Sequence, residues 1–300
     1  MTRLDLTALN HEAEAAWQGV LDLAEASPEG WALAGGQAVF VQATLHGEQP
    51  PRPSTDADLV IDLRADPGAA RRIVDALRAI GFDTTRRDAN GRAHRWERGD
   101  AQIDVLQPRY LGDRIEKRLS REGLETIAAP GAQHLLSRTE LVTVTLGSRS
   151  AQIRTPTALG IIVGKAAGFQ EIIDDPYRVR HLADILTIGP LITARELRSE
   201  APYTRLEKQR VGNAVWKIRD GSFANALRPW FPADLEQRVE RLAAVHRNHA
   251  ARSHSPLPSP VVSREAAPTP SQRNPWAGSW PRAHGGPDHS GQGPSHGFSM

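Results

Sequence analysis

Apolar positions recur with two different spacings along the first 190 residues, which predicts a domain that mixes helices and strands. Helical spacing predicts helices at residues 4–24, 36–46, 67–80, 109–121, 156–170 and 177–188. Short apolar or alternating runs predict strands at residues 31–34, 56–63, 82–87, 92–98, 101–106, 140–146 and 152–154. Asn90-Gly91 fits a hairpin turn between two of these strands. We therefore expect an α/β (α+β) domain over residues 1–190.

The pattern changes after residue 190. Apolar residues in 191–252 recur at helical spacing only, with Pro229 and Pro232 between segments, which predicts a C-terminal helical subdomain. Residues 253–300 are rich in Pro, Ser, Gly and His. Such a composition cannot bury enough apolar area to offset its chain entropy, so we expect a disordered C-terminal tail. Within it, Trp276 and Trp280 are a candidate docking element.

Composition narrows the setting in which the chain works. Its 300 residues include no cysteine, which excludes a disulfide framework and a Cys-based zinc site and suits a reducing cytoplasm. Residues 1–30 are amphipathic and acidic, unlike a signal peptide. No apolar run approaches the ~20 residues of a membrane span. We expect a cytoplasmic protein without a membrane segment.

The distribution of charge argues against a general affinity for nucleic acid. The formal net charge is +2, and residues 251–300 carry all of it, with four arginines against two acids. The other 250 residues are balanced, so they create no overall positive field. A local arginine cluster before residue 104 is either an RNA-binding patch or a solvated hairpin face. It comprises Arg86, Arg87, Arg92, Arg95, Trp96 and Arg98.

Two carboxylates open the predicted strand at 56–63. Side chains alternate along a strand, so Asp56 and Asp58 should project to one side, while Leu59 and Ile61 face a core. Adjacent acids repel each other and are best tolerated around a divalent cation. The alternative is a solvated junction between loop and strand. Upstream, Gly35-Gly36 at a strand–helix junction would allow close backbone approach and offer N–H groups to a phosphate.

Further candidates follow downstream. Asp104 should lie on the strand face opposite Ile103 and Val105, where it could share the cation, unless it is an edge residue facing water. Lys165, expected near the end of the helix that Pro156 opens, is one of only four lysines. Its compact charge suits a phosphate, although a helix-surface position would explain it equally. Asp184 lies on the next helix and could simply form a weak surface pair with Arg180.

In this order, Gly-Gly, Thr-Asp-x-Asp, Asp, Lys and Asp resemble the motifs of the polymerase-β-like nucleotidyltransferases, in particular the AbiEii-type toxins of type IV toxin–antitoxin pairs. The resemblance covers roughly residues 31–188. It implies a polymerase-β-like nucleotidyltransferase sheet with flanking helices. It also implies transfer of a nucleoside monophosphate from an NTP to an acceptor hydroxyl with Mg²⁺ (or Mn²⁺), an RNA acceptor such as a tRNA 3′ end, and a cognate antitoxin protein.

The same resemblance suggests a role for each candidate. Asp56, Asp58 and Asp104 would hold metal, and Asp104 would also activate the acceptor. Asp184 would position the triphosphate or the acceptor. The residues expected to bind nucleotide are Gly35, Gly36, Thr55, Lys165 and Arg180. In the family's Arg-x-Lys-Asp-x-x-Asp-Leu helix, Arg180 replaces the lysine and His181 replaces the first acid.

Two other functions remain open at this point. The chain could be a small-molecule adenylyltransferase of the antibiotic-modifying kind, with Glu171, Asp174 and Asp175 supplying an acidic cleft. It could also be a catalytically inactive nucleotide-binding or assembly module. His181 and the long connection from Gly36 to Asp56 favour that alternative, whereas the three carboxylates oppose it.

Overall fold

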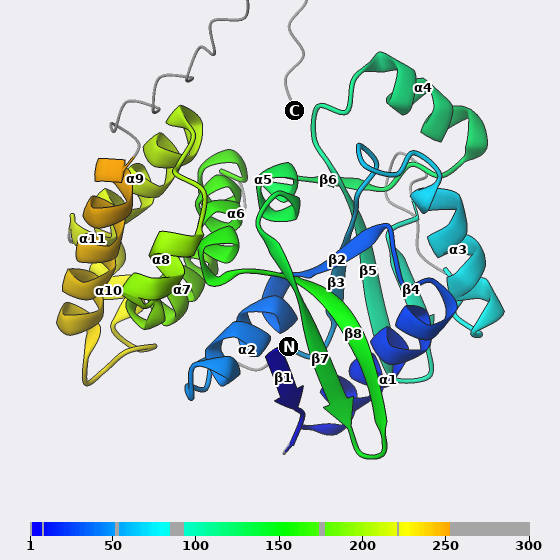
Figure 1. Ribbon diagram of the computed structural model, residues 1–300, viewed down its shortest axis with the longest axis horizontal. Helices are drawn as coiled ribbons and strands as arrows, with labels where there is room; N and C mark the ends of the chain where they lie inside the picture. The colour runs from blue at the N-terminus through cyan, green and yellow to red at the C-terminus, as the bar shows by residue number, and fades with distance from the viewer. Residues whose placement is uncertain are drawn as a thin grey trace, which may run out of the picture. The chain divides into compact units, whose positions relative to one another are not determined.

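In the computed structural model, the protein is a mixed α/β fold with two β-sheets and flanking helices (Figure 1). The structure describes residues 2–7, 9–51, 54–84, 93–173, 178–220 and 222–252. The predicted tail at 253–300 and the Asn90-Gly91 turn lie outside these residues. So do several predicted side chains, namely Arg86, Arg87, Arg92, Asp174, Asp175, Trp276 and Trp280.

The larger sheet carries the candidate carboxylates. Its strands run in the order β2 (Trp31–Ala34), β3 (Ala57–Ile61), β5 (Ala101–Pro108) and β4 (Arg95–Arg98), and β6 (Ile127–Ala129) pairs with the end of β5. β3 and β5 are parallel, and their register pairs Asp58 with Asp104. β2 runs antiparallel to β3, with Ala34 opposite Asp58. Residues far apart in sequence therefore meet on one stretch of sheet.

The two faces of this sheet differ in character. One face packs against α1 (His11–Ala26) and α3 (Ala69–Ala79), and its core includes the buried side chains of Trp17, Leu59 and Ile103. Because side chains alternate along a strand, Asp58, Val60 and Asp104 point to the other face. That face looks toward α5 (Ala132–Leu136) and α6 (Ala158–Glu171). The predicted alternation of acids and core residues on these strands is confirmed.

The smaller sheet corrects one prediction. It contains β1 (Thr2–Asp5), β7 (Thr139–Leu146) and β8 (Arg149–Pro156), with β1 parallel to β7. The helix expected from residue 4 therefore begins only at His11, where the Asn10 side chain accepts a hydrogen bond of 2.8 Å from the Ala13 amide. Leu4 and Leu6 are both buried. Leu4 and Leu6 are two residues apart, which is the spacing of side chains on one face of a strand. Hydrogen bonding to β7 makes this segment a strand and not a helix.

Several smaller boundaries also differ from expectation. β6 and α5 were not predicted, and α4 (Asp113–Glu122) starts later than the helix expected from residue 109. Of the strand expected at 82–87, the structure describes residues 82–84, and there Asp83 forms an isolated bridge to Glu97. These short elements have few apolar positions, so pairing with β5 and packing on α6 define them more than local sequence does.

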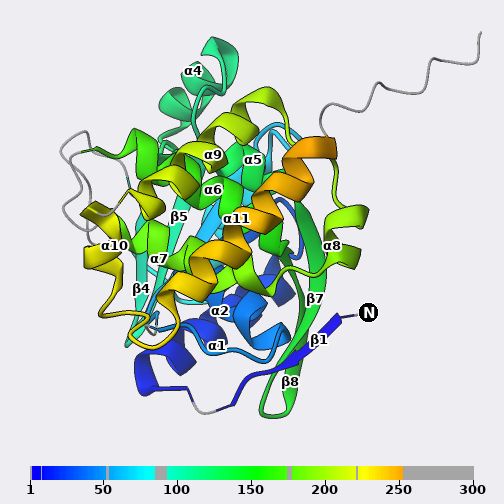
Figure 2. The ribbon, with the colours of Figure 1, turned by 90° about the vertical axis from the view of Figure 1, so that its left-hand side faces the viewer.

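The helices that follow α6 along the chain form one helical region, in which α7 and α9 pack directly on α6 (Figure 2). α2 (Gly35–Leu45) and α6 both contact α7 (Val179–Ile188), which η1 (Gly189–Leu191) extends. α9 (Arg205–Arg219) packs on α6, and α11 (Leu235–Arg252) packs on α9. Two short helices, α8 (Ala194–Ser199) and α10 (Ser222–Leu227), complete this region. Among the described residues, no helix is long and apolar enough to cross a membrane.

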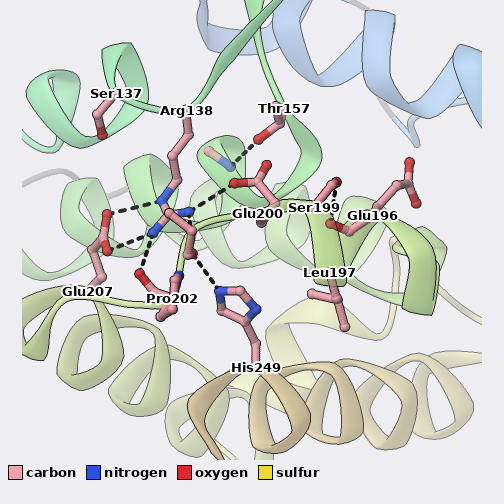
Figure 3. A network of polar contacts seen from close by, with 12 residues as sticks. Ser137, Arg138, Thr157, Glu196, Leu197, Ser199, Glu200, Pro202, Glu207 and His249 are labelled. Atoms are coloured by element: carbon pink, nitrogen blue, oxygen red, sulfur yellow. Dashed lines mark hydrogen bonds and ion pairs between the residues drawn. The ribbon is translucent and has the colours of Figure 1, made fainter. Parts of the chain in front are cut away.

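A buried arginine anchors the α8–α9 loop to the start of β7 (Figure 3). Arg138 donates hydrogen bonds to both carboxylate oxygens of Glu207 at 3.2 and 3.0 Å, and to Glu200 at 2.9 Å. It also donates to the backbone carbonyls of Ala201 and Pro202. Burial alone would raise the pKa of Glu207, but hydrogen bonds from His134 and Arg138 outweigh it and hold that pKa well below its usual range. Removing one partner of such a buried pair typically costs about 3–5 kcal/mol.

Candidate active site

A cavity of about 380 Å³ lies against the polar face of the larger sheet. Its walls come from the β2–α2 junction, β3, β5, the β6–α5 segment, α6 and α7. Seven of the predicted site residues line it, namely Gly35, Gly36, Asp56, Asp58, Asp104, Lys165 and Arg180. Thr55 does not line the cavity and is exposed, so its predicted nucleotide contact has no support in this arrangement. Asp184 is buried behind the wall.

Gly35 is placed so that only glycine fits. It begins α2 directly after β2, with φ +60°, a conformation that disfavours residues with a side chain. A Cβ at this position would lie 1.6 Å from Oδ2 of Asp58. The missing side chain therefore makes room for the Asp58 carboxylate. The N-terminus of α2, with its amide groups and partial positive charge, begins beside that carboxylate.

Asp58 occupies an unfavourable place for a negative charge. Burial raises its pKa to about 7, and the nearby carboxylates of Asp56 and Asp104 add to this effect. Lys165 and Arg180 oppose the rise but do not cancel it. Asp56 is partly exposed in the cavity and accepts a hydrogen bond of 3.1 Å from the Ser54 hydroxyl. A cation between these acids would relieve their repulsion.

Asp104 is already held by an arginine. Arg95 on β4 is its register partner, and its Nε and Nη2 donate to Oδ1 and Oδ2 of Asp104 at 2.9 and 2.8 Å. Both residues line the cavity. In the ranges that the structure describes, no group of three or more Asp, Glu, His or Cys side chains is arranged to hold a metal ion. The carboxylate oxygens fit Mg²⁺ by their chemistry, but both oxygens of Asp104 face a guanidinium.

Lys165 and Asp184 form an ion pair between two helices. Nζ of Lys165 on α6 lies 2.6 Å from Oδ2 of Asp184 on α7, and both side chains are largely buried. The sequence predicts that Lys165 lies near the end of its helix. This prediction is wrong, because α6 continues to Glu171. The alternatives that placed either residue on a helix surface are wrong. The ammonium group is held at the cavity wall by a buried carboxylate.

Several residues of the cavity were not predicted as site residues. His181 lines the wall, and a Cβ on Gly168 would lie 3.3 Å from its ring. Gly131 has φ +74°, and a Cβ there would lie 2.9 Å from the Gly164 carbonyl, so α5 approaches α6 closely. The spacing of glycines at 160, 164 and 168 is the sequence signal that could have indicated this close packing. The sequence places Arg95 only in the arginine cluster before residue 104 and gives it no role in the site.

That arginine patch is also corrected by the structure. Trp96 is 2% exposed and belongs to the core, so it cannot stack on a nucleic acid. Arg98 binds Asp22 at 2.6 Å, and Arg95 binds Asp104. The described members of this arginine cluster are therefore engaged within the protein.

The cavity combines three kinds of surface. Its carboxylates are Asp56, Asp58 and Asp104, and its cationic side chains are Arg95, Lys165 and Arg180. Apolar side chains complete it, among them Val60, Leu106, Leu135, Ile161 and Ile172. Carboxylates suit a divalent cation, cationic groups suit phosphates, and an apolar wall suits a flat ring.

No protein-family model matches the sequence, and no curated protein matches it. One solved structure, that of an antigenic nucleotidyltransferase-like protein from Paracoccidioides brasiliensis, is similar with a TM-score of 0.42 and 14% sequence identity. The similarity covers 78% of this chain and 95% of that one. Likeness at this level carries no argument about function, which has to come from the cavity itself.

Proposed function

We propose that this protein is a metal-dependent nucleotidyltransferase that moves a nucleoside monophosphate from an NTP to an acceptor hydroxyl. One observation carries the proposal. Asp58 and Asp104 are register partners on β3 and β5, and they share a cavity with Asp56, Lys165 and Arg180. An enzyme that transfers a charged group from a triphosphate needs acids for the cation and fixed positive charge for the phosphates.

Asp56 and Asp58 are the residues that would hold Mg²⁺ or Mn²⁺. Their oxygens are ligands that Mg²⁺ prefers, and a bound cation would stabilise the charged form of Asp58, which burial and the neighbouring acids disfavour. When bound, the metal neutralises charge on the triphosphate and the leaving pyrophosphate. Asp104 would complete this metal site, and it would also orient the acceptor hydroxyl and take its proton.

The cationic wall would position the triphosphate. Lys165 is held by Asp184, so its ammonium group pays little additional entropy on meeting a phosphate. Arg180 lies on the same wall. The amide groups that start α2 at Gly35-Gly36 offer hydrogen bonds to phosphate oxygens. The apolar side chains around Leu106 and Ile161 would contact the base.

The proposal extends to the acceptor and the biological setting, which the geometry of the cavity does not address. We propose an RNA acceptor, such as a tRNA 3′ end, and a role as the toxin of a toxin–antitoxin pair in the cytoplasm. Only the motif order from Gly35 to Asp184 supports this part. The small-molecule alternative is weakened because Glu171, its described acid, is paired with Arg109 and Arg210.

The test is an incubation of the full chain with labelled NTPs, Mg²⁺ or Mn²⁺, and total RNA. Label should enter RNA with the wild-type protein and not with Asp58→Asn. The matched control is Asp100→Asn, because Asp100 is exposed, pairs with His11 and does not line the cavity. Label in a small molecule would move the acceptor class to the alternative. Absence of label in any product, from well-folded protein, would contradict the reaction.

A further inference from the structure

Arg95 lines the cavity, and its present contact conflicts with the proposed chemistry. Its guanidinium spans both oxygens of Asp104 in a bidentate pair, at 2.9 and 2.8 Å. Asp104 is 8% exposed and the Arg95 side chain is 27% exposed, so solvent screens the pair only in part. The two hydrogen bonds occupy one lone pair on each oxygen of Asp104, which leaves fewer for a cation. The positive guanidinium would also repel a divalent ion close to it.

The same guanidinium is well placed for a phosphate. Arg95 lines the cavity that Lys165 and Arg180 also line. A guanidinium binds phosphate oxygens with the same two-pronged geometry that it uses on a carboxylate. A triphosphate would bring several negative charges into this space, whereas Asp104 offers one. Transfer of Arg95 from Asp104 to a phosphate would exchange one bidentate pair for another.

We propose that Arg95 is a positioning residue that couples the two ligands of the site. It holds Asp104 while the cavity lacks nucleotide, and it moves to the polyphosphate of an NTP, which frees Asp104 for the divalent cation. This inference rests on the proposed function, because it assumes that the cavity takes an NTP and a metal ion. It makes the cation bind weakly until the nucleotide arrives.

The coupling predicts effects of opposite sign when the guanidinium is removed. Arg95→Gln frees Asp104, so the metal alone should bind more tightly. The same change removes a phosphate contact, so the nucleotide alone should bind more weakly. A purely structural role for Arg95 would weaken both ligands or neither. The loss of one charge-assisted contact corresponds to a change of about tenfold in each affinity.

The experiment measures the two ligands separately. Free Mn²⁺ is titrated into the protein without nucleotide and followed by electron paramagnetic resonance. ATP and the other NTPs are titrated in EDTA and followed by calorimetry. Arg98→Gln is the matched control, because Arg98 lies on the same strand and binds Asp22 outside the cavity. If Arg95→Gln does not fold, Arg95→Lys keeps the charge, loses the fork, and should shift both affinities in the same directions by less.

The expected result is tighter Mn²⁺ binding and weaker NTP binding in Arg95→Gln, with Arg98→Gln like wild type. Unchanged or weaker Mn²⁺ binding in Arg95→Gln would overturn the coupling, and so would undiminished NTP binding. The two proposals fail separately. If the wild-type protein transfers nucleotide but Arg95→Gln shows no opposite shifts in affinity, the proposed reaction stands and the proposed role of Arg95 is wrong. If Arg95→Gln shows the opposite shifts in affinity but the wild-type protein never transfers nucleotide, the proposed reaction is wrong and the coupling by Arg95 stands.

Discussion

Asp58 and Asp104 lie opposite each other on parallel neighbouring strands, and the two side chains respond to this position differently. Asp104 is neutralised by Arg95, whereas Asp58 faces a second acid at position 56. One sheet face thus holds a carboxylate paired with an arginine beside a carboxylate whose charged form is disfavoured. The second carboxylate is where a metal ion would gain most.

The raised pKa of Asp58 predicts a pH-dependent stability. The pKa in the folded protein is about 7 against an ordinary value of 3.8, so the fold favours the neutral carboxyl. This contribution to stability is complete below about pH 4 and is lost as pH rises to about 7. Its size is at most about 4 kcal/mol, and partial exposure of Asp58 to the cavity reduces it. Urea unfolding in EDTA at several pH values measures this contribution. In Asp58→Asn, the decrease in the free energy of unfolding with rising pH should disappear.

A substitution at Gly35 should be far more damaging than one at another glycine of the same conformation. Gly35→Ala forces a Cβ into the Asp58 carboxylate and keeps a positive φ. We expect a loss of several kcal/mol in the free energy of unfolding, together with loss of transfer. Gly47→Ala is the control, because Gly47 also has positive φ but has nothing within 4 Å of the added Cβ. Its cost should be about 1 kcal/mol. Equal costs in denaturant unfolding would show that Asp58 can move aside.

Lys165 should matter for both binding and transfer. Lys165→Ala removes the ammonium group from the cavity wall, and we expect a loss in kcat/KM worth about 2–4 kcal/mol. Lys165→Arg should rescue only part of it, because a planar fork replaces a compact charge. Lys208→Ala is the control, since Lys208 does not line the cavity. Near-normal turnover in Lys165→Ala would remove the cationic wall from the mechanism.

Stability and function can be separated at the same pair. Lys165→Ala leaves the buried Asp184 without this cation, which should destabilise the fold. A double variant, Lys165→Met with Asp184→Asn, removes both charges and should recover much of the stability. Transfer should stay low in the double variant. If transfer returns with stability, Lys165 acts only as a structural partner.

The C-terminal tail should be dispensable for catalysis, as its composition predicts. The truncation belongs after Arg252, because Arg252 donates hydrogen bonds to the carbonyls of Leu197 and Arg198. Melting temperature and nucleotide transfer should match those of the full chain. A well-folded truncation without transfer activity would instead indicate that the tail, which contains Trp276 and Trp280, contributes to the site.

Local pattern was enough for one part of this site and not for another. The alternation at Asp58 and Leu59 follows from strand geometry alone, so the polar face could be predicted, whereas Asp56 lies just before β3 and not on it. The Arg95–Asp104 pair depends on the register between β4 and β5, which no property of either residue fixes. Likewise, the contact between Lys165 and Asp184 requires the packing of α6 on α7. The spacing of Leu4 and Leu6 is compatible with a helix and with a strand, and pairing with the distant strand β7 makes this segment a strand.

The anchor at Arg138 links the region after residue 190 to the helix that carries Lys165. The Arg138 carbonyl accepts a hydrogen bond from the Thr157 amide, at the residue that caps α6. Its guanidinium meanwhile grips Glu200 and Glu207, in the stretch where α9 begins. α6 is thus fixed at its first turn, and α9 packs against it. The residues that fix Lys165 in space therefore include some that never reach the cavity, so nucleotide affinity should respond to changes made far outside it.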